Sequence, residues 1–254
     1  MSDKYINANT TGIVLMLHGN SSSPRVFENL QIDFKTYKPV LPGHGEKGRK
    51  SDSFLSIDAF QKKLVNELNA MDCPIFIIGN SAGGHIAIEM APEIINLKGL
   101  MIFGTPPVKK PINFDEAFIS IPELQTFLTE NPNDEEIDRA AQATLRNQNL
   151  KDVITDDFQK AHPSVRSHLL KNIQNGVWMD QSEIFKNLDC ERFMVIPEHD
   201  NSINSVYLKN IASNSQGAVE IIEIKDCGHY PTLEKPEEMS TIINERVKRV
   251  FHEY

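Results

Sequence analysis

The sequence predicts an α/β fold in which a mostly parallel central sheet is flanked by helices. Three observations carry this prediction. Short apolar runs alternate with helical patterns at both ends of the chain, which is typical of a parallel sheet covered on both faces. Glycine-containing or polar turns follow these runs directly. The middle of the chain shows apolar residues at helical spacing only, which indicates a helical insertion.

The first part of the chain contains alternating strand and helix patterns. Strands are expected at 13–17, 37–41, 74–78 and 98–103, and helices near 24–30, 56–70 and 82–90. The alternation resumes late in the chain, where strands are expected at 191–196 and 219–224 and a helix from about 236 to 251. A length of 254 residues suits one such domain with a modest insertion.

Between residues 106 and 180 the alternation stops. Six prolines divide this segment into several expected helices. Asn133, followed three residues later by Glu136, resembles a capping box at the start of one of them. We expect residues 106–180 to form a helical lid over the catalytic edge of the sheet, while 1–105 and 181–254 form the core.

The stretch Gly79-Asn80-Ser81-Ala82-Gly83 is the most informative motif. It lies between an expected strand and an expected helix, which is the setting of a nucleophile elbow. Small residues two before and two after the serine allow the strained turn that exposes the Ser81 hydroxyl. The Ala82 N–H is then directed at a developing oxyanion. An ordinary glycine-rich turn has the same pattern, so the other catalytic groups decide between the two.

The acid and the histidine are expected after two later strands. Enzymes built on this elbow present nucleophile, acid and histidine in that order. Asp200 follows strand 191–196 and His229 follows strand 219–224. His229 would remove the serine proton, and Asp200 would hold the imidazole in the correct tautomer. The rival acid Glu198 is expected to be a surface or supporting carboxylate, and the strand ending near residue 103 is followed by no carboxylate.

A second oxyanion donor is expected in the loop after the first strand. His18-Gly19-Asn20 follows the apolar run 13–17, and the Asn20 N–H would point into the site. His18 is expected to brace this loop through hydrogen bonds, because the order of the triad already assigns His229 as the base.

The charge of the chain limits its partners. Lys and Arg number 26 against 35 Asp and Glu, which gives a net charge of −9. This argues against nucleic acid or an anionic membrane as a partner and leaves a small molecule as the expected one. The N-terminus has no basic, apolar signal-peptide pattern, and no run is long enough to span a membrane. A monomer and a homodimer both remain open.

The cysteines and histidines suggest neither disulfides nor a metal. Cys73, Cys190 and Cys227 are widely spaced and odd in number, which fits reduced, mostly buried thiols in a cytoplasmic protein. Cys227 is expected to serve packing, although it lies close to His229. The eight histidines are scattered rather than set at ligand spacing, so neither a metal nor another cofactor is expected.

Along nearly its whole length the chain resembles the α/β-hydrolase family. The resemblance rests on the elbow, on Gly228-His229 and on Pro42-Gly43-His44-Gly45. It implies the α/β-hydrolase fold with its helical lid. The antiparallel hairpin that usually opens this fold would be missing or reduced to residues 4–8. Relatives that dehalogenate or open epoxides use an aspartate nucleophile, which Ser81 disfavours.

More narrowly, the chain resembles the α/β-hydrolase type of N-acyl homoserine lactonase, the quorum-quenching enzymes. The shared stretches are 18–23, 84–90 and 104–108. The resemblance implies that Asn20 helps to hold the lactone. It departs at the lid, where 106–180 contains no tyrosine, and at Asn80, which replaces a bulky aromatic residue and would widen or polarise the pocket.

These features predict a serine hydrolase that cleaves a carboxylic ester or a lactone. Asn80 and five lid residues are the candidates for an acyl pocket, although packing between lid helices explains each lid residue equally well: Phe114, Phe118, Phe127, Phe158 and Trp178. A general carboxylesterase, and a binding or sensor protein built on the same fold, remain alternatives. Acyl transfer or C–C cleavage by the same triad also remains open.

Overall fold

The structure, a computed structural model, describes residues 12–46, 48 and 56–252. The hairpin remnant expected at residues 4–8 lies outside the described residues. Within them, six strands form one sheet in the order β2-β1-β3-β4-β5-β6, and every neighbouring pair is parallel. The predicted parallel sheet is therefore confirmed. The strands are β1 (Ile13–Leu17), β2 (Lys35–Tyr37), β3 (Ile75–Asn80), β4 (Leu97–Phe103), β5 (Glu191–Pro197) and β6 (Val219–Ile224).

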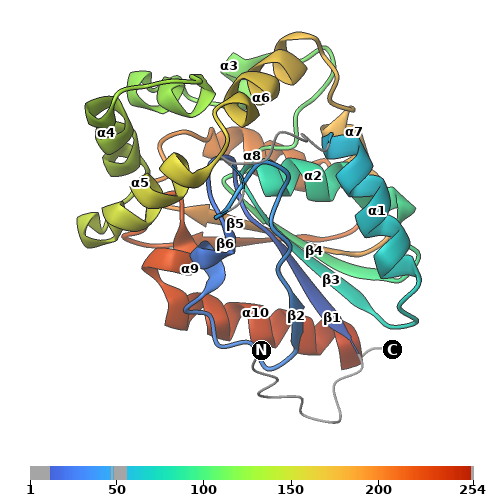
Figure 1. Ribbon diagram of the computed structural model, residues 1–254. Helices are drawn as coiled ribbons and strands as arrows, with labels where there is room; N and C mark the ends of the chain where they lie inside the picture. Colours follow the sequence, from blue (N-terminus) through green and yellow to red (C-terminus); the bar gives the residue numbers. More distant parts are fainter. Residues whose placement is uncertain (1–11, 47, 49–55, 253–254) are drawn as a thin grey trace.

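Both faces of the sheet are covered by helices (Figure 1). The side chain of Leu15 in β1 packs into the hydrophobic cluster on one face, whereas Val14 and Met16 pack into the cluster on the other. A strand covered on both faces needs an apolar residue at every position, which explains the uninterrupted run in β1. One face carries α1 (Ile57–Asn69), α2 (Ala82–Met90), α7 (Gln181–Asn187) and α8 (Ser205–Ser213), and the other carries α10 (Pro236–His252).

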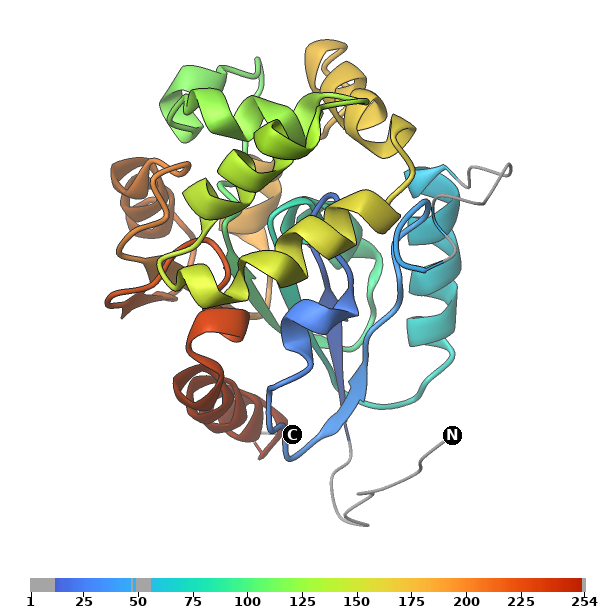
Figure 2. The same ribbon diagram turned by 60° about the vertical axis from the view of Figure 1, so that its left-hand side comes forward.

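A helical segment separates β4 from β5. Figure 2 shows its helices lying across one end of the sheet. Asn133 and Glu136 form the predicted capping box at the start of α4, each side chain bonding the other's backbone N–H. The segment contains α3 (Phe114–Ala117), α4 (Asp134–Thr144), α5 (Lys151–Lys160) and α6 (Ser164–Gln174), with 3-10 turns η4 (Pro122–Leu128) and η5 (Gln148–Leu150). Shorter pieces elsewhere are η1 (Pro24–Phe27), η3 (Ala91–Glu93) and α9 (Pro231–Glu234).

Two early elements differ from the sequence prediction. The helix expected near 24–30 is only the 3-10 turn Pro24–Phe27. The strand expected at 37–41 lies earlier, at Lys35–Tyr37. Pro39 cannot donate a ladder hydrogen bond, and the N–H of Leu41 is donated to the His18 side chain at 3.0 Å instead. Leu41 is therefore buried without extending the strand, whereas Val40 is exposed.

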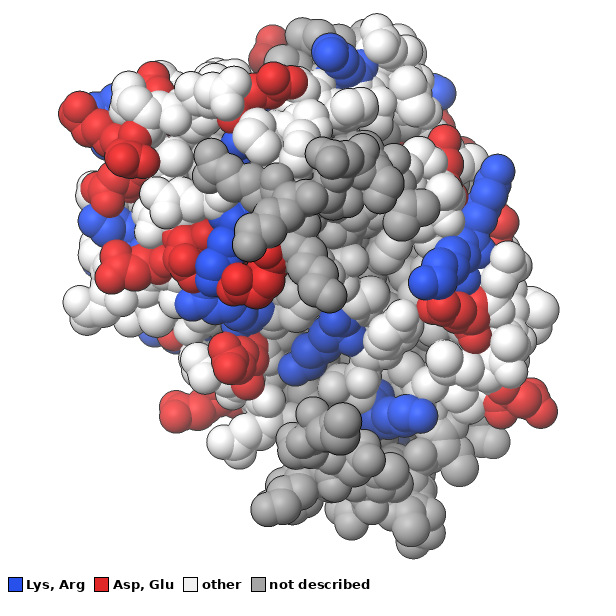
Figure 3. All heavy atoms as spheres, viewed as in Figure 1, with Lys and Arg blue, Asp and Glu red and all other residues white. Residues whose placement is uncertain are grey.

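Acidic and basic side chains are intermixed over α4 and α5 on the face seen in Figure 3. Arg139 pairs with Glu135 at 2.6 Å, and Lys160 pairs with Asp156 at 2.8 Å. Such exposed pairs contribute about 0.5 kcal/mol or less each. No helix in the described part of the chain is both long and apolar enough to cross a membrane.

Arg166 of α6 connects the helical segment to the loop after β1. Its guanidinium is buried and donates to the carbonyl oxygens of Thr129 and Glu130, both at 2.7 Å, and to the Ser21 hydroxyl at 3.2 Å. It also lies 4.1 Å above the centre of the Phe158 ring. One side chain therefore ties together three parts of the chain that are distant in sequence.

We expect Arg166→Met to lower the free energy of unfolding by about 2–4 kcal/mol, because the buried guanidinium loses three charge-assisted hydrogen bonds and its contact with the Phe158 ring. Arg139→Met makes the same chemical change at an exposed ion pair and should cost about 0.5 kcal/mol or less. Urea unfolding of both variants at neutral pH measures the difference. Equal losses of stability would contradict this account of Arg166.

Candidate active site

Ser81 occupies a sharp turn between β3 and α2. Its backbone φ is +51° and ψ is −121°, a strained combination for a residue other than glycine. The turn is held because the Ser81 N–H donates to the Phe103 carbonyl at 2.9 Å, while the Thr105 hydroxyl donates to the Ser81 carbonyl at 2.9 Å. The predicted strand–turn–helix geometry at Ser81 is therefore present.

Two glycines of the motif are required by close backbone contacts. A Cβ atom on Gly83 would lie 2.3 Å from the carbonyl oxygen of Leu17, and one on Gly79 would lie 2.5 Å from Cα of Gly84. Neither contact can be relieved by moving a side chain, because the clashing atoms belong to the backbone. The start of α2 therefore packs directly on the end of β1, which brings the loop after β1 beside Ser81.

His229 and Asp200 are joined by a hydrogen bond of 2.8 Å between Nδ1 and Oδ2. The other carboxylate oxygen, Oδ1, accepts from the Ser202 hydroxyl at 2.5 Å. The backbone N–H of His229 donates to the Thr144 carbonyl at the end of α4, at 2.8 Å. The imidazole also lies against Gly104, where a Cβ atom would come within 2.4 Å of Cε1. The ring is thus fixed on several sides.

The electrostatics of this pair favour a charged carboxylate. Burial alone raises the pKa of Asp200, but the charge of His229 and the hydrogen bonds from His229 and Ser202 outweigh it and hold the pKa below its ordinary value. Burial lowers the pKa of His229, yet the Asp200 charge, the Asp200 hydrogen bond and the charge of Glu234 together raise it above the usual 6.5.

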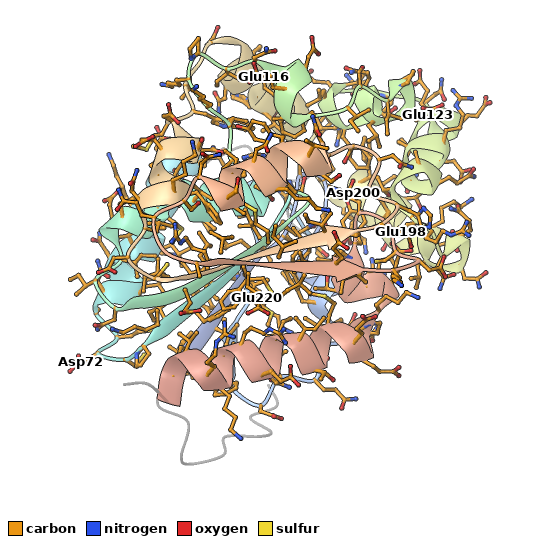
Figure 4. All side chains as sticks on the ribbon, turned by 180° about the vertical axis from the view of Figure 1, so that it is seen from behind. Asp72, Glu116, Glu123, Glu198, Asp200 and Glu220 are labelled. Atoms are coloured by element: carbon orange, nitrogen blue, oxygen red, sulfur yellow. The ribbon has the colours of Figure 1, made fainter. Side chains whose placement is uncertain are left out.

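Glu198, the rival acid, is engaged elsewhere. Its Oε2 accepts a hydrogen bond from the Asp226 N–H at 2.9 Å, and more than half of its side chain is exposed. Asp226 has a φ of +47°, so Glu198 supports a tight turn after β6. Figure 4 shows Glu198 and Asp200 near the same end of the sheet, opposite Asp72. The carboxylate bonded to His229 is Asp200.

A cavity of about 580 Å³ opens in front of Ser81. Four of the predicted catalytic and oxyanion residues line it together: Asn20, Ser81, Ala82 and His229. The side chains of the helical segment supply most of its apolar wall: Phe114, Phe118, Ile119, Leu124, Phe127, Leu128 and Trp178. This composition, mostly apolar with a few convergent polar groups, is typical of a small-molecule site.

Two of the predicted pocket residues lie outside this cavity. Phe158 is buried within the helical segment, edge-on to Phe127 at 5.5 Å and beneath Arg166. Asn80 is fully buried behind the elbow, with Nδ2 3.5 Å from the carbonyl oxygens of Phe103 and His229. Asn80 therefore does not line the cavity.

Histidines hold the two loops that frame the oxyanion region. His18 accepts the Leu41 N–H at Nε2 and contacts the Gly19 carbonyl through Nδ1, at 3.0 and 2.9 Å. His44 accepts the Ser21 N–H at 2.9 Å. Burial is the main reason that the pKa of His18 falls to about 3 and that of His44 to about 4, so both rings are neutral acceptors. The predicted bracing role of His18 is confirmed.

Asn20 connects the loop after β1 to the helical segment. Its side-chain Nδ2 donates to the Phe127 carbonyl at 2.7 Å. Its neighbour Gly19 passes so close to the elbow that a Cβ atom there would lie 3.1 Å from Cβ of Ser81. This contact places the loop after β1 beside the serine, and Asn20 lines the cavity together with Ser81.

Sequence reasoning missed several residues around the site. Ser202 lies two positions after Asp200, a spacing at which serine commonly bonds a preceding carboxylate. Tyr230 and His85 also line the cavity. His85 lies in the first turns of α2, four residues after Ser81, and a residue so soon after the nucleophile is a candidate for the wall of the site. That spacing was the available signal.

Two further groups bear on the chemistry. Cys227 is fully buried, and burial raises the pKa of its thiol far above the ordinary value, so it stays protonated and serves packing. Among the described residues, no three His, Cys, Asp or Glu side chains gather as a metal site requires.

Comparisons with known proteins agree with this fold. The family model described as the alpha/beta hydrolase family matches residues 14–241. No curated protein sequence matches the chain. A variant of the N-acyl homoserine lactonase AidH, complexed with N-hexanoyl homoserine, superposes with a TM-score of 0.81 at 22% identity, covering 94% of this chain and 90% of that one.

Other solved structures are similarly close. Est816, titled an N-acyl homoserine lactone degrading enzyme, has a TM-score of 0.71 at 18% identity, covering 92% of each chain. A protein of Acinetobacter baumannii described as a candidate lipase has a TM-score of 0.76 at 18% identity, covering 98% of this chain and 87% of that one. At such low identities these likenesses establish the fold.

We expect NMR titration to give His229 a pKa above 6.5, because Asp200 stabilises the imidazolium. Asp200→Asn keeps a hydrogen-bond acceptor but removes the charge, so burial dominates and the pKa should fall below 6.5. Glu198→Gln is the matched control, and it should leave the pKa unchanged because Glu198 bonds the Asp226 N–H instead. A His229 pKa that responds to Glu198 and not to Asp200 would reverse the assignment.

Proposed function

The chain belongs to the alpha/beta hydrolase family, and we propose that it cleaves a carboxylic ester or a lactone. In this proposal Ser81 is the nucleophile, His229 is the base and Asp200 is the carboxylate that orients His229. The observation that carries the proposal is the buried Nδ1–Oδ2 bond of 2.8 Å, with His229 and the strained Ser81 lining one cavity. A serine hydroxyl needs such a base before it can attack a carbonyl carbon.

In the proposed mechanism the Ser81 oxygen attacks the substrate carbonyl while His229 Nε2 takes the serine proton. The negative charge that develops on the carbonyl oxygen is held by the backbone N–H groups of Ala82 and Asn20. His229 then donates the proton to the departing alkoxide, which leaves an acyl-enzyme on Ser81. Water, activated by His229, releases the acid. Asp200 holds the imidazole in the tautomer that each step needs.

The substrate that we favour is an N-acyl homoserine lactone. The local sequence resemblance at residues 18–23 and 104–108 supports it, as does the structural similarity to AidH, an N-acyl homoserine lactonase, and to Est816, an N-acyl homoserine lactone degrading enzyme. The apolar wall formed by the helical segment suits an acyl chain. Residues 106–180 would then act as a lid over the lactone, with the acyl tail beneath it.

A general carboxylesterase is the second candidate. The segment 106–180 lacks the tyrosine that the lactonase resemblance implies, and an apolar wall accepts many acyl chains. A binding or sensor protein has less support, because a receptor has no need of a buried histidine–carboxylate pair beside a serine on a strained turn. We place the enzyme in the cytoplasm, where its three free cysteines stay reduced.

We expect Ser81→Ala to abolish labelling by a fluorophosphonate and to lower ester turnover at least about 10³-fold, since the acyl-enzyme can no longer form. Ser213→Ala, at the exposed end of α8, is the matched control and should label and turn over like the wild type. Gel-based labelling and an aryl-ester assay measure both variants. Wild-type turnover by Ser81→Ala would rule out the serine mechanism.

We expect N-acyl homoserine lactones to be opened to the free acyl homoserine, which mass spectrometry detects as the addition of one water. Each methylene buried under the lid adds about 0.8 kcal/mol, so kcat/KM should rise about fourfold per carbon until the cavity is full. Rapid cleavage of aryl esters without opening of any lactone, at any chain length, would leave the general carboxylesterase as the better proposal.

A further inference from the structure

His85 is a second histidine in the wall of the cavity. It lies one turn after Ser81 on α2, and its backbone N–H donates to the Ser81 carbonyl at 3.2 Å. Both residues line the same cavity. The ring is almost fully buried, so the cavity is where it can meet a small molecule.

The protonation of His85 is determined by residues behind it. Its Nδ1 lies 2.7 Å from Oε1 of Gln181. The amide group of Gln181 has one orientation, because its Nε2 donates to Oε1 of Glu89 at 2.9 Å while its Oε1 also accepts the Val108 N–H at 3.5 Å. A carbonyl oxygen facing Nδ1 requires Nδ1 to carry the hydrogen. The Nε2 atom of neutral His85 therefore has a free lone pair.

The ring is also held neutral and fixed in place. Burial lowers the pKa of His85 to about 4, and the hydrogen bond with Gln181 offsets only part of this effect. The Trp178 ring stacks on the imidazole, with centroids 4.4 Å apart and planes 24° apart. Within the described part of the chain, the His85 ring forms its hydrogen bond through Nδ1. At neutral pH, Nε2 is thus a rigid hydrogen-bond acceptor.

We infer that His85 determines specificity, accepting at Nε2 a hydrogen bond from an N–H that the substrate carries on the carbon next to the scissile carbonyl. The inference rests on the proposed function and deepens it: in an N-acyl homoserine lactone this donor is the amide N–H. In this arrangement the oxyanion and catalytic groups contact the scissile carbonyl and the ring oxygen. His85 binds the amide N–H instead, a group that simple esters lack.

The physical basis is the cost of leaving a buried polar atom unpaired. A substrate with N–H satisfies Nε2, whereas an analogue with CH2 in that position leaves the lone pair facing an apolar group. Sites built to bond a substrate N–H reject analogues without it much more strongly than apolar pockets distinguish one methylene from another. The discrimination should therefore appear in kcat/KM.

The test compares N-hexanoyl homoserine lactone with the lactone in which CH2 replaces the amide N–H. The wild type should prefer the amide by about 10- to 100-fold in kcat/KM. His85→Phe keeps a flat ring against Trp178 but removes the acceptor, and its preference should fall to within about threefold. His168→Phe is the matched control: it makes the same chemical change at an exposed histidine outside the cavity and should retain the wild-type preference.

A second variant tests the tautomer without changing the wall of the cavity. Gln181→Met removes the carbonyl that holds the hydrogen on Nδ1, so the preference for the amide should shrink while fluorophosphonate labelling of Ser81 persists. This variant also serves if His85→Phe fails to fold by circular dichroism.

Three results would overturn the inference. A wild-type preference near one, or a preference that His85→Phe and Gln181→Met both retain, rejects His85 as the acceptor and leaves the proposed function intact. Absence of lactone opening by the wild type also rejects it. The fate of the proposed function is then read separately, from fluorophosphonate labelling of Ser81 and turnover of aryl esters.

Discussion

The close contact between the start of α2 and the end of β1 is the constraint on which the rest of the site depends. Gly83 lies against the backbone of Leu17 so tightly that no side chain fits, and this contact brings the loop after β1 beside Ser81. The unfavourable φ of Ser81 persists because the Phe103 carbonyl accepts the Ser81 N–H and the Thr105 hydroxyl donates to the Ser81 carbonyl, so both backbone groups of the residue are held. A strained backbone conformation of this kind persists only where several surrounding contacts hold it in place.

Around this contact, histidines are used in two opposite electrostatic states. His18 and His44 are buried without a carboxylate partner, so burial keeps them neutral and they act as acceptors for backbone N–H groups. His229 is also largely enclosed but faces Asp200, which reverses the direction of its pKa shift. A histidine side chain therefore acts either as a neutral hydrogen-bond acceptor that holds a loop or as a base that accepts a proton, depending on whether a carboxylate lies beside it.

The fold could be predicted from the sequence wherever a single local signal was sufficient. The helix Ala82–Met90 and the strand Val219–Ile224 have the predicted boundaries, because apolar residues make up most of both segments. The prediction was wrong for β2, because the bond from the Leu41 N–H to His18 links positions 23 residues apart, and no local pattern reveals it.

The site was predictable to a similar extent. The order of the motifs correctly paired Asp200 with His229 rather than Glu198. Phe158 was indistinguishable from Phe118 in the sequence, since helical spacing identifies an apolar face but not the neighbour that covers it. The tautomer of His85 depends on Gln181, which is 96 positions away in the chain. Such contacts arise only once the tertiary structure has formed.

The hydrogen bonds between the helical segment and the core have a consequence for how this family can diversify. The loop that carries His229 is bonded to the end of α4 through the Thr144 carbonyl, and Glu234 accepts the N–H groups of Arg146, Asn147 and Gly228 within 2.8 Å. The helical segment is therefore not an interchangeable module. A recombinant that inherits residues 106–180 from one parent and α9 from another must inherit matching partners at this junction, or lose the alignment of its base.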